Sequence, residues 1–189
     1  DGQVLTSTGS GVAWEDAGGG ASALVASTVL SSAAASITLT GFSTTYDMYR
    51  ILGTFSASAY DYFRARWTAD NGTAHSSSNY AWNYHRKSSG NDGYDKPYMW
   101  DITNAGLPIT HQVGTFAPTL DAIISNPKND NHTPTIHGLF AIGSSDGASN
   151  IVGVYRDQDL DVGGIELSLV NGNNFTAGTH VRIYGLNKS

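Results

Sequence analysis

The sequence contains no cysteine and few charged residues. The absence of cysteine among its 189 residues excludes disulfide bonds and thiolate metal sites, so stability must come from packing or oligomerisation. Charged residues make up 14% of the chain, against roughly 25% in an average globular domain. The formal net charge is -6, so no positive field attracts a phosphate backbone or an anionic lipid surface. We expect neither nucleic acid partners nor membrane insertion.

Long apolar runs and a leader-like start are also missing. No segment approaches the ~18 apolar residues of a membrane span. The start, Asp1-Gly2-Gln3-Val4, lacks a basic region followed by an apolar one. The chain also begins without methionine, and we expect it to be a fragment or a processed piece of a longer protein.

The first 20 residues read as a separate small unit. Two short β-rich runs, 3–6 and 12–15, flank the turn Thr8-Gly9-Ser10-Gly11, and Gly18-Gly19-Gly20 follows them. This order predicts a hairpin and then a flexible joint over residues 1–20. A two-stranded hairpin is barely stable alone, so its apolar residues need a neighbouring surface.

The remainder, residues 21–189, has the pattern of an all-β domain. Short β-rich runs alternate with Gly, Ser, Asn and Asp clusters, as in a sandwich or barrel. Segment 31–35, the best helical candidate, is too short to propagate and reads as a connection. We expect about nine strands, because the first of ten runs reads as irregular. The runs are 24–30, 36–40, 48–56, 62–68, 79–87, 120–125, 135–142, 150–156, 164–170 and 180–186. We predict an antiparallel β-sandwich of the jelly-roll type.

Alternation along the runs predicts which faces are buried. In one run Phe63, Ala65 and Trp67 alternate with polar residues, and in another Ile165, Leu167 and Leu169 alternate with Glu166 and Ser168, which indicates half-buried strands. Other runs are apolar on both faces. They are Ile151, Gly153 and Tyr155 with Val152 and Val154, and Val181 and Ile183 with Tyr184 and Leu186. We infer that some outer faces are subunit contacts around a symmetry axis.

Two aromatic groups are candidates for sugar binding. Tyr80, Trp82 and Tyr84 share one face of an expected strand, and strict strand spacing favours a place in the core over a stacking platform. The stretch 88–100 reads as a loop in which aromatics lie among amides and carboxylates. Its polar groups could hydrogen-bond sugar hydroxyls while an aromatic ring stacks on the sugar; otherwise it is a connection pinned by its own aromatics. The predicted ligand-binding residues are Asn91, Asp92, Tyr94, Asp95, Tyr98 and Trp100.

Metal and catalytic patterns are weak. Asp157, Asp159 and Asp161 have the spacing that opens a calcium loop, but Val162 stands where an EF-hand needs glycine and Ser168 where it needs glutamate. A solvated acidic turn is the alternative, and no histidine spacing indicates a zinc site. We predict no metal and no cofactor.

The sequence also lacks the G-x-S-x-G turn of a serine hydrolase. Glycan hydrolysis needs two carboxylates about 5 to 9.5 Å apart along a groove that a compact domain rarely offers. Asp92 with Asp95, or Asp157 with Asp161, would meet that separation only by accident. We predict that the protein is not an enzyme.

Two segments at opposite ends of the chain carry a resemblance to a known family. They read Asp1-Gly2-Gln3-Val4-Leu5-Thr6-Ser7-Thr8-Gly9-Ser10-Gly11-Val12-Ala13-Trp14-Glu15-Asp16-Ala17 and Asn174-Phe175-Thr176-Ala177-Gly178-Thr179-His180-Val181-Arg182-Ile183-Tyr184-Gly185-Leu186. The first resembles the Gly-Gln-Val-Leu, Gly, Trp unit before Gly-rich joints in fibre and spike proteins of tailed bacteriophages, particularly those of marine and cyanobacterial hosts. The second is similar to the Phe, Ala-Gly-Thr, Ile-Tyr-Gly-Leu ending of their C-terminal domains. Together the segments span about a sixth of the chain.

The resemblance implies a homotrimer on the virion surface, where a tail fibre tip attaches the particle to the host. In such a fibre, residues 1–20 would be a shaft or collar segment with its Gly-rich joint, and residues 21–189 the tip domain. The expected partners are further copies of the chain, other tail or capsid proteins, and a host surface receptor, with a carbohydrate as the expected ligand. Two alternatives remain open. One is a capsid decoration or head-fibre protein on the capsid exterior, and the other is a polysaccharide depolymerase spike.

Overall fold

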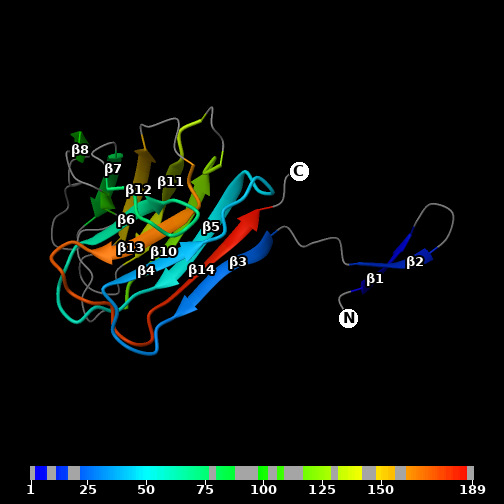
Figure 1. Ribbon diagram of the computed structural model, residues 1–189, viewed down its shortest axis with the longest axis horizontal. Coiled ribbons are helices and arrows are strands. Elements are labelled where there is room, and N and C mark those ends of the chain that lie inside the picture. The colour runs from blue at the N-terminus through cyan, green and yellow to red at the C-terminus, as the bar shows by residue number, and fades with distance from the viewer. Residues whose placement is uncertain are drawn as a thin grey trace.

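The computed structural model describes residues 3–7, 12–16, 22–76, 80–87, 98–101, 106–108, 117–128, 132–141, 148–155 and 161–186. Over these residues the protein is all-β, without a helix (Figure 1). The strands are β1 (Gln3–Ser7), β2 (Val12–Asp16), β3 (Ser22–Val29), β4 (Ser36–Thr40), β5 (Met48–Thr54), β6 (Phe63–Thr68), β7 (Tyr80–Lys87), β8 (Tyr98–Asp101), β9 (Leu107–Pro108), β10 (Thr119–Ser125), β11 (Thr135–Ala141), β12 (Ala148–Tyr155), β13 (Gly164–Leu169) and β14 (His180–Leu186).

The described strands form two large antiparallel sheets that pack as a sandwich (Figure 1). The larger sheet has eight strands in the order β3-β14-β5-β10-β11-β12-β7-β8, and the smaller has four in the order β4-β13-β6-β9. The set β3-β14-β5-β10 facing β4-β13-β6-β9 is the strand order of a jelly roll, in which the chain crosses repeatedly from sheet to sheet. The pairs β11-β12 and β7-β8 extend the larger sheet beyond β10. The predicted jelly-roll sandwich is confirmed.

The N-terminal strands β1 and β2 form a two-stranded sheet of their own. Leu5 pairs with Trp14 and Ser7 with Val12 in its antiparallel register. The predicted hairpin is therefore present, and Figure 1 shows it to one side of the sandwich.

The sequence predicts most of the strands of the sandwich. Each of the ten expected runs contains an observed strand, with ends that agree to within two residues. The first run forms the eight-residue strand β3, so leaving it out of the expected count of about nine strands is wrong; its pairing with β14 has one register shift, at Ile183/Tyr184. Segment 31–35 is a connection that contains one isolated bridge, from Ala34 to Phe175. The sequence misses β8 and β9; β8 lies in a stretch that reads as a loop, and β9 has only two residues.

Aromatic rings fill the space between the two sheets. Phe63 of β6 lies 4.6 Å from Phe55, measured between ring centroids, and 5.8 Å from both Phe140 and Phe175. All four are 0% exposed, as is Trp67. Rings in tilted and edge contacts at these distances add to the large apolar area that each one buries. The alternating residues expected to face inward, in β6 and β13, are accordingly buried.

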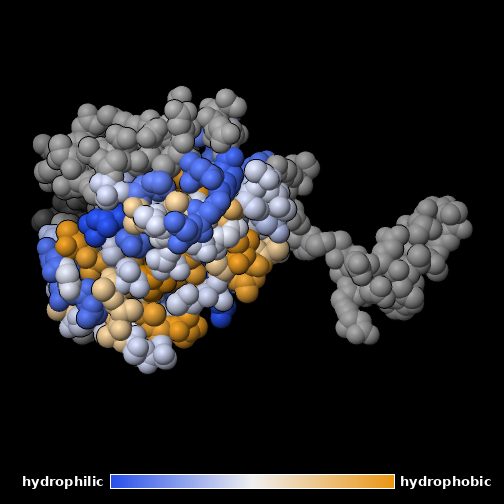
Figure 2. All heavy atoms as spheres, viewed as in Figure 1, coloured by the Kyte–Doolittle hydropathy of each residue, from blue (hydrophilic) through white to orange (hydrophobic). Residues whose placement is uncertain are grey.

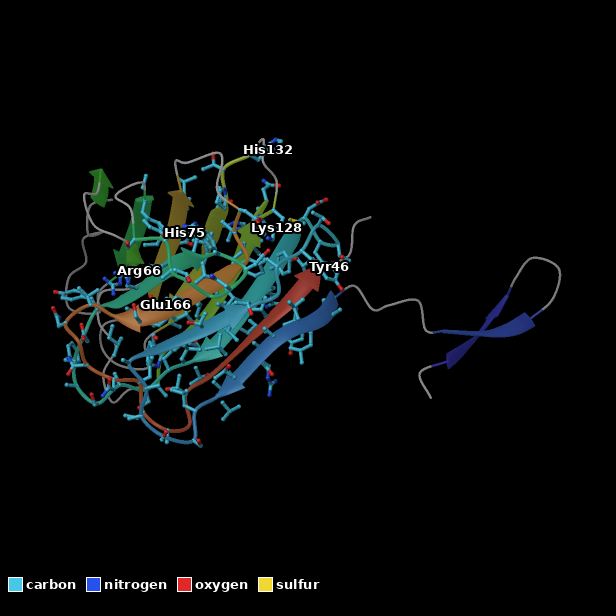
Figure 3. All side chains as sticks on the ribbon, in the orientation of Figure 1. Tyr46, Arg66, His75, Lys128, His132 and Glu166 are labelled. Atoms are coloured by element: carbon cyan, nitrogen blue, oxygen red, sulfur yellow. The ribbon has the colours of Figure 1, made fainter. Side chains whose placement is uncertain are left out.

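The C-terminal segment that resembles fibre proteins supplies a central strand and the loop before it. Strand β14 lies between β3 and β5, and its Val181 and Ile183 are fully buried. Thr179 both accepts a hydrogen bond from the Ser56 N–H at 3.1 Å and donates one to the Ser56 carbonyl at 3.2 Å. A Cβ atom on Gly185 would lie 2.4 Å from the Tyr46 ring, which stands beside the end of β14 (Figure 3). Packing thus restricts this segment at Phe175, Thr179, Val181, Ile183 and Gly185.

A buried carboxylate fixes the turn between β13 and β14. Asp61, 1% exposed, accepts hydrogen bonds from the backbone N–H groups of Tyr62, Asn171 and Asn173 and from the Asn173 side chain, at 2.7 to 3.3 Å. Burial alone would raise the pKa of Asp61, but these hydrogen bonds together hold it below its ordinary value. The ionised carboxylate therefore joins the turn after β13 to the segment before β6.

We expect Asp61→Asn to lower the free energy of unfolding at pH 7 by about 2 kcal/mol, because it puts an amide donor against N–H donors that now share a carboxylate. Since the folded pKa lies below the unfolded one, the stability from ionised Asp61 is present above the unfolded pKa and lost as the pH falls through the folded pKa. Urea unfolding of both proteins between pH 7 and about pH 2 measures this.

The control is Asp121→Asn, which removes an exposed ion pair and should cost less than about 1 kcal/mol. The role of Asp61 is refuted if the Asp61→Asn and Asp121→Asn variants unfold at the same urea concentration at pH 7, or if the difference between wild type and Asp61→Asn persists at acidic pH.

Candidate functional site

Most of the predicted sugar-binding residues lie outside the described residues: Asn91, Asp92, Tyr94 and Asp95. Tyr98 and Trp100 are in strand β8, so the expected loop location is wrong for these two residues, while their role in sugar binding stays a prediction. The backbone of β8 pairs with β7 in a register that places Tyr98 opposite Tyr84 and Trp100 opposite Trp82. The two aromatic groups are therefore adjacent parts of one sheet edge.

The first member of the aromatic stripe, Tyr80, belongs to the core as predicted. It is 1% exposed, and its hydroxyl accepts a hydrogen bond from the Trp67 N–H at 3.0 Å and donates one to the His75 carbonyl at 2.9 Å. Because Tyr80 is on β7 and Trp67 on β6, this hydroxyl connects the two sheets. The side chains of Trp82 and Tyr84 lie outside the described part of the chain.

The calcium candidate contains one described carboxylate, and a lysine holds it. Lys128 donates hydrogen bonds to the Oδ1 atoms of Asp161 and Asp70, both at 2.6 Å, and its side chain is 12% exposed. Burial would lower the pKa of Lys128, but the two carboxylates raise it above its usual value. An ion at Asp161 would have to displace this ammonium group. Asp157 and Asp159 lie outside the described residues.

The outer face of the eight-stranded sheet exposes large apolar side chains. Leu24 is 57% exposed and Met48 45%, and the half-buried Tyr184 and Leu186 lie beside them because β14 pairs with both β3 and β5. We call these four residues the joint-side patch, since β3 begins here directly after the Gly-rich stretch. Figure 2 shows hydrophobic side chains along β3. Contiguous exposed apolar residues of this kind mark interaction surfaces.

Other strands of the same face continue the apolar surface. Leu139 of β11 is 56% exposed and Val152 of β12 is 51% exposed. The prediction that β12 and β14 carry apolar residues on both faces is confirmed where side chains are described: Val181 and Ile183 face the core while Tyr184 and Val152 lie on the outer face.

A bidentate ion pair lies at the centre of this outer face. Arg50 Nε and one terminal nitrogen donate to the two oxygens of Asp121 at 2.8 and 2.6 Å. This pairing raises the pKa of Arg50 and lowers that of Asp121. Both side chains are about half exposed, so the pair contributes little to stability and instead fixes the position of the Asp121 carboxylate.

The outer face of the four-stranded sheet is polar. Arg66 pairs with Glu166 at 3.5 Å (Figure 3), and two nitrogens of Arg64 donate to Ser168 Oγ at 3.2 Å. Ser168 was expected to face solvent, but it is 6% exposed. It lies on the outer face as predicted, and the hydrogen-bonded Arg64 side chain helps to cover it. These charges are satisfied within the sheet.

Within the described ranges, no group of three or more His, Asp or Glu side chains could hold a metal ion. None of the described residues forms a helix long and apolar enough to cross a membrane.

The outer face of the large sheet is the surface that sequence reasoning only partly found. Alternation indicated apolar residues on both faces of β12 and β14, but not which polar residues from other strands would join them. That depends on the order β14-β5-β10, which brings together residues more than a hundred positions apart. The chain matches no protein-family model and no curated protein.

Because Lys128 already neutralises Asp161, we expect millimolar calcium to leave the melting temperature within about 1 °C of its value in EGTA. An ion at a hundred times its Kd would add about 2.7 kcal/mol, which is roughly 5 to 10 °C for a chain of this length. Thermal unfolding with calcium, with magnesium as the control, and with EGTA measures this. If calcium, but not magnesium, raised the melting temperature by several degrees in a saturable way, the protein would have a calcium site after all.

Proposed function

We propose that this protein is a surface module of a tailed bacteriophage virion, the tip of a tail fibre or similar spike, and that it attaches the particle to a glycan on the host cell. It acts by display and binding, without catalysis. Its partners are further copies of itself, in a homotrimer, and neighbouring proteins of the virion.

The observation that carries the proposal is what the two resembling segments build. The N-terminal one forms the hairpin β1-β2, and the C-terminal one forms a central strand of the jelly roll and the loop before it. Phe175, Thr179 and Gly185 are each restricted by contacts in the core or next to it. A short motif of this kind is therefore tied to the fold, which supports its use as a sign of the family.

The joint-side patch supports assembly of several copies. Leu24 and Met48 remain exposed in a single chain, at the end of the sheet where the shaft-like segment enters the domain. Copies joined at their shafts would bring these patches together around a common axis. Burial of such surfaces stabilises a cysteine-free fibre tip through association.

Binding without cleavage is supported by the state of the surface carboxylates. Hydrolysis of a glycosidic bond requires two carboxyl groups free to act as acid and as base or nucleophile. Among the described residues, Asp70 and Asp161 contact Lys128, Asp121 contacts Arg50, and Glu166 contacts Arg66. Each of these carboxylates is already engaged by a cation.

We expect the protein to have three times the mass of one chain in light scattering at micromolar concentration. Met48→Glu should convert it to a monomer, because burying a charge at the contact costs several kcal/mol per ion. Val170→Glu is the matched control, since Val170 has nearly the same exposure, 46% against 45% for Met48, and lies outside the patch. A monomeric wild type, or equal dissociation of both variants, counts against the trimer.

We expect labelled protein to bind cells of at least one marine bacterial or cyanobacterial strain, with competition from that strain's purified surface polysaccharide. The polysaccharide should keep its chain length after incubation, as measured by size-exclusion chromatography. Progressive shortening would show an enzyme instead.

Immunogold labelling of virions should mark the tail; gold confined to the capsid lattice would indicate a decoration protein.

A further inference from the structure

A shallow hollow lies on the outer face of the large sheet, at the end away from the joint-side patch. It has a volume of about 320 Å³ and is lined mainly by Leu52, Thr54, Thr119, Asp121, His180 and Arg182. This volume is at the lower end of the roughly 300 to 1,000 Å³ of small-molecule sites. The lining comes from β14, β5 and β10, which are adjacent in the sheet, so the hollow has a rigid base.

The register arranges the lining in two rows across the three strands. His180, Thr54 and Thr119 form one row, and Arg182, Leu52 and Asp121 form the next. Since neighbouring strands lie about 4.8 Å apart, the Cα atoms of Arg182 and Asp121 are separated by roughly 10 Å. Leu52 lies between them as an apolar floor. The two charged side chains thus start from strands on either side of Leu52.

Arg182 differs from the other basic residues of the protein. Among the side chains that the structure describes, it is the one arginine or lysine with neither an ion pair nor a side-chain hydrogen bond: Arg50, Arg64, Arg66 and Lys128 each have a partner. Asp121 is paired with Arg50 through both of its oxygens and forms no ion pair with Arg182. Each oxygen keeps a lone pair that can accept a further hydrogen bond. Because Arg50 offsets the charge of Asp121, the exposed guanidinium group of Arg182 leaves the hollow with a positive charge, in a chain with a net charge of -6.

Building on the attachment function proposed above, we propose that this hollow binds an anionic saccharide, a pyranose ring that bears a carboxylate. Arg182 donates hydrogen bonds to the carboxylate of the sugar, a bidentate geometry for which arginine is suited. Thr54 and Thr119 exchange hydrogen bonds with ring hydroxyls, Asp121 accepts from another, and Leu52 contacts the apolar ring face. A small inorganic anion would lack the hydroxyl groups that match Asp121 and the threonines.

The position of the hollow agrees with attachment. Met48 begins β5 in the joint-side patch and Thr54 ends it at the hollow, so the far edges of the two surfaces lie about 20 Å apart along the strand. Their near edges adjoin, since Tyr184 of the patch is two residues from Arg182 on β14. The joint enters the domain at the patch. Association through the patch therefore leaves the hollow at the end of the domain away from the shaft.

The test uses the full chain labelled with ¹⁵N and titrated with sodium glucuronate, glucose or sodium acetate, followed by amide chemical shifts. We expect glucuronate to shift amides of residues 52–54, 119–121 and 180–182, and glucose and acetate to shift them much less. Arg182→Gln should weaken glucuronate binding about tenfold. Arg66→Gln, the same change on the outer face of the other sheet, should bind as the wild type does.

Thr119→Val separates a sugar from a bare anion, because it removes a hydroxyl and keeps the shape of the side chain. It should weaken the response to glucuronate and leave that to acetate unchanged. If acetate shifted the amides as much as glucuronate does, the hollow would be a site for anions in general. If glucose shifted them as much as glucuronate does, the charge of the sugar would have no role in binding. Shifts confined to other residues, or no shifts at all, would overturn the proposal.

Cell binding separates this site from the function on which it rests. If wild type and Arg182→Gln attach equally well to the same cells, the hollow is not the attachment site although the attachment function stands. If glucuronate binds at the hollow but no host cell is bound, the attachment function fails and the saccharide site remains.

Discussion

The contact of Phe55 with Phe63, on opposite sheets, is the interaction on which the rest of the structure depends. Without cysteine, no disulfide joins the two sheets, and side-chain packing between them carries most of their association. Phe140 of β11 and Phe175, in the loop before β14, complete the cluster. The strands added beyond β10 and the loop before β14 therefore both contribute a ring to it. The jelly-roll crossings bring these four residues, distant in sequence, to one place.

Around this core, single polar groups fix the connections. Asp61 organises the turn before β14, and the hydroxyl of Tyr49 accepts from the Ser43 N–H and donates to the Ser43 carbonyl. The hydroxyl of Tyr80 likewise accepts from the Trp67 N–H of β6 and donates to the His75 carbonyl in the segment after β6. Each group satisfies backbone atoms that the change of sheet leaves without a strand partner. A chain with few charges thus uses hydroxyls and one buried carboxylate where others use salt bridges.

The sequence was sufficient to predict the sandwich because alternation depends on local burial, as in Phe63, Ala65 and Trp67. It did not predict β9, because a strand of two residues is too short to show an alternating pattern. It did not predict β8 either, because Tyr98 and Trp100 follow Gly, Asn and Asp residues typical of turns. The candidate site was less predictable. Arg182, Thr54 and Asp121 belong to separate runs, and only the strand order makes them neighbours. Of the predicted loop residues, Asn91 and Asp95 lie outside the described structure.

The four strands beyond β10 enlarge one sheet at a single edge and leave the eight strands of the jelly roll intact. Their connections, residues 88–97, 102–105 and 142–147 among them, join strands at that edge or lead away from it. Segments 88–97 and 142–147 each join two strands of the same sheet, so insertions and deletions there alter no crossing between the sheets. Such a layout separates connections whose length can change from the strands that set the fold, so the edge of the large sheet can accept changes in sequence that the jelly roll could not.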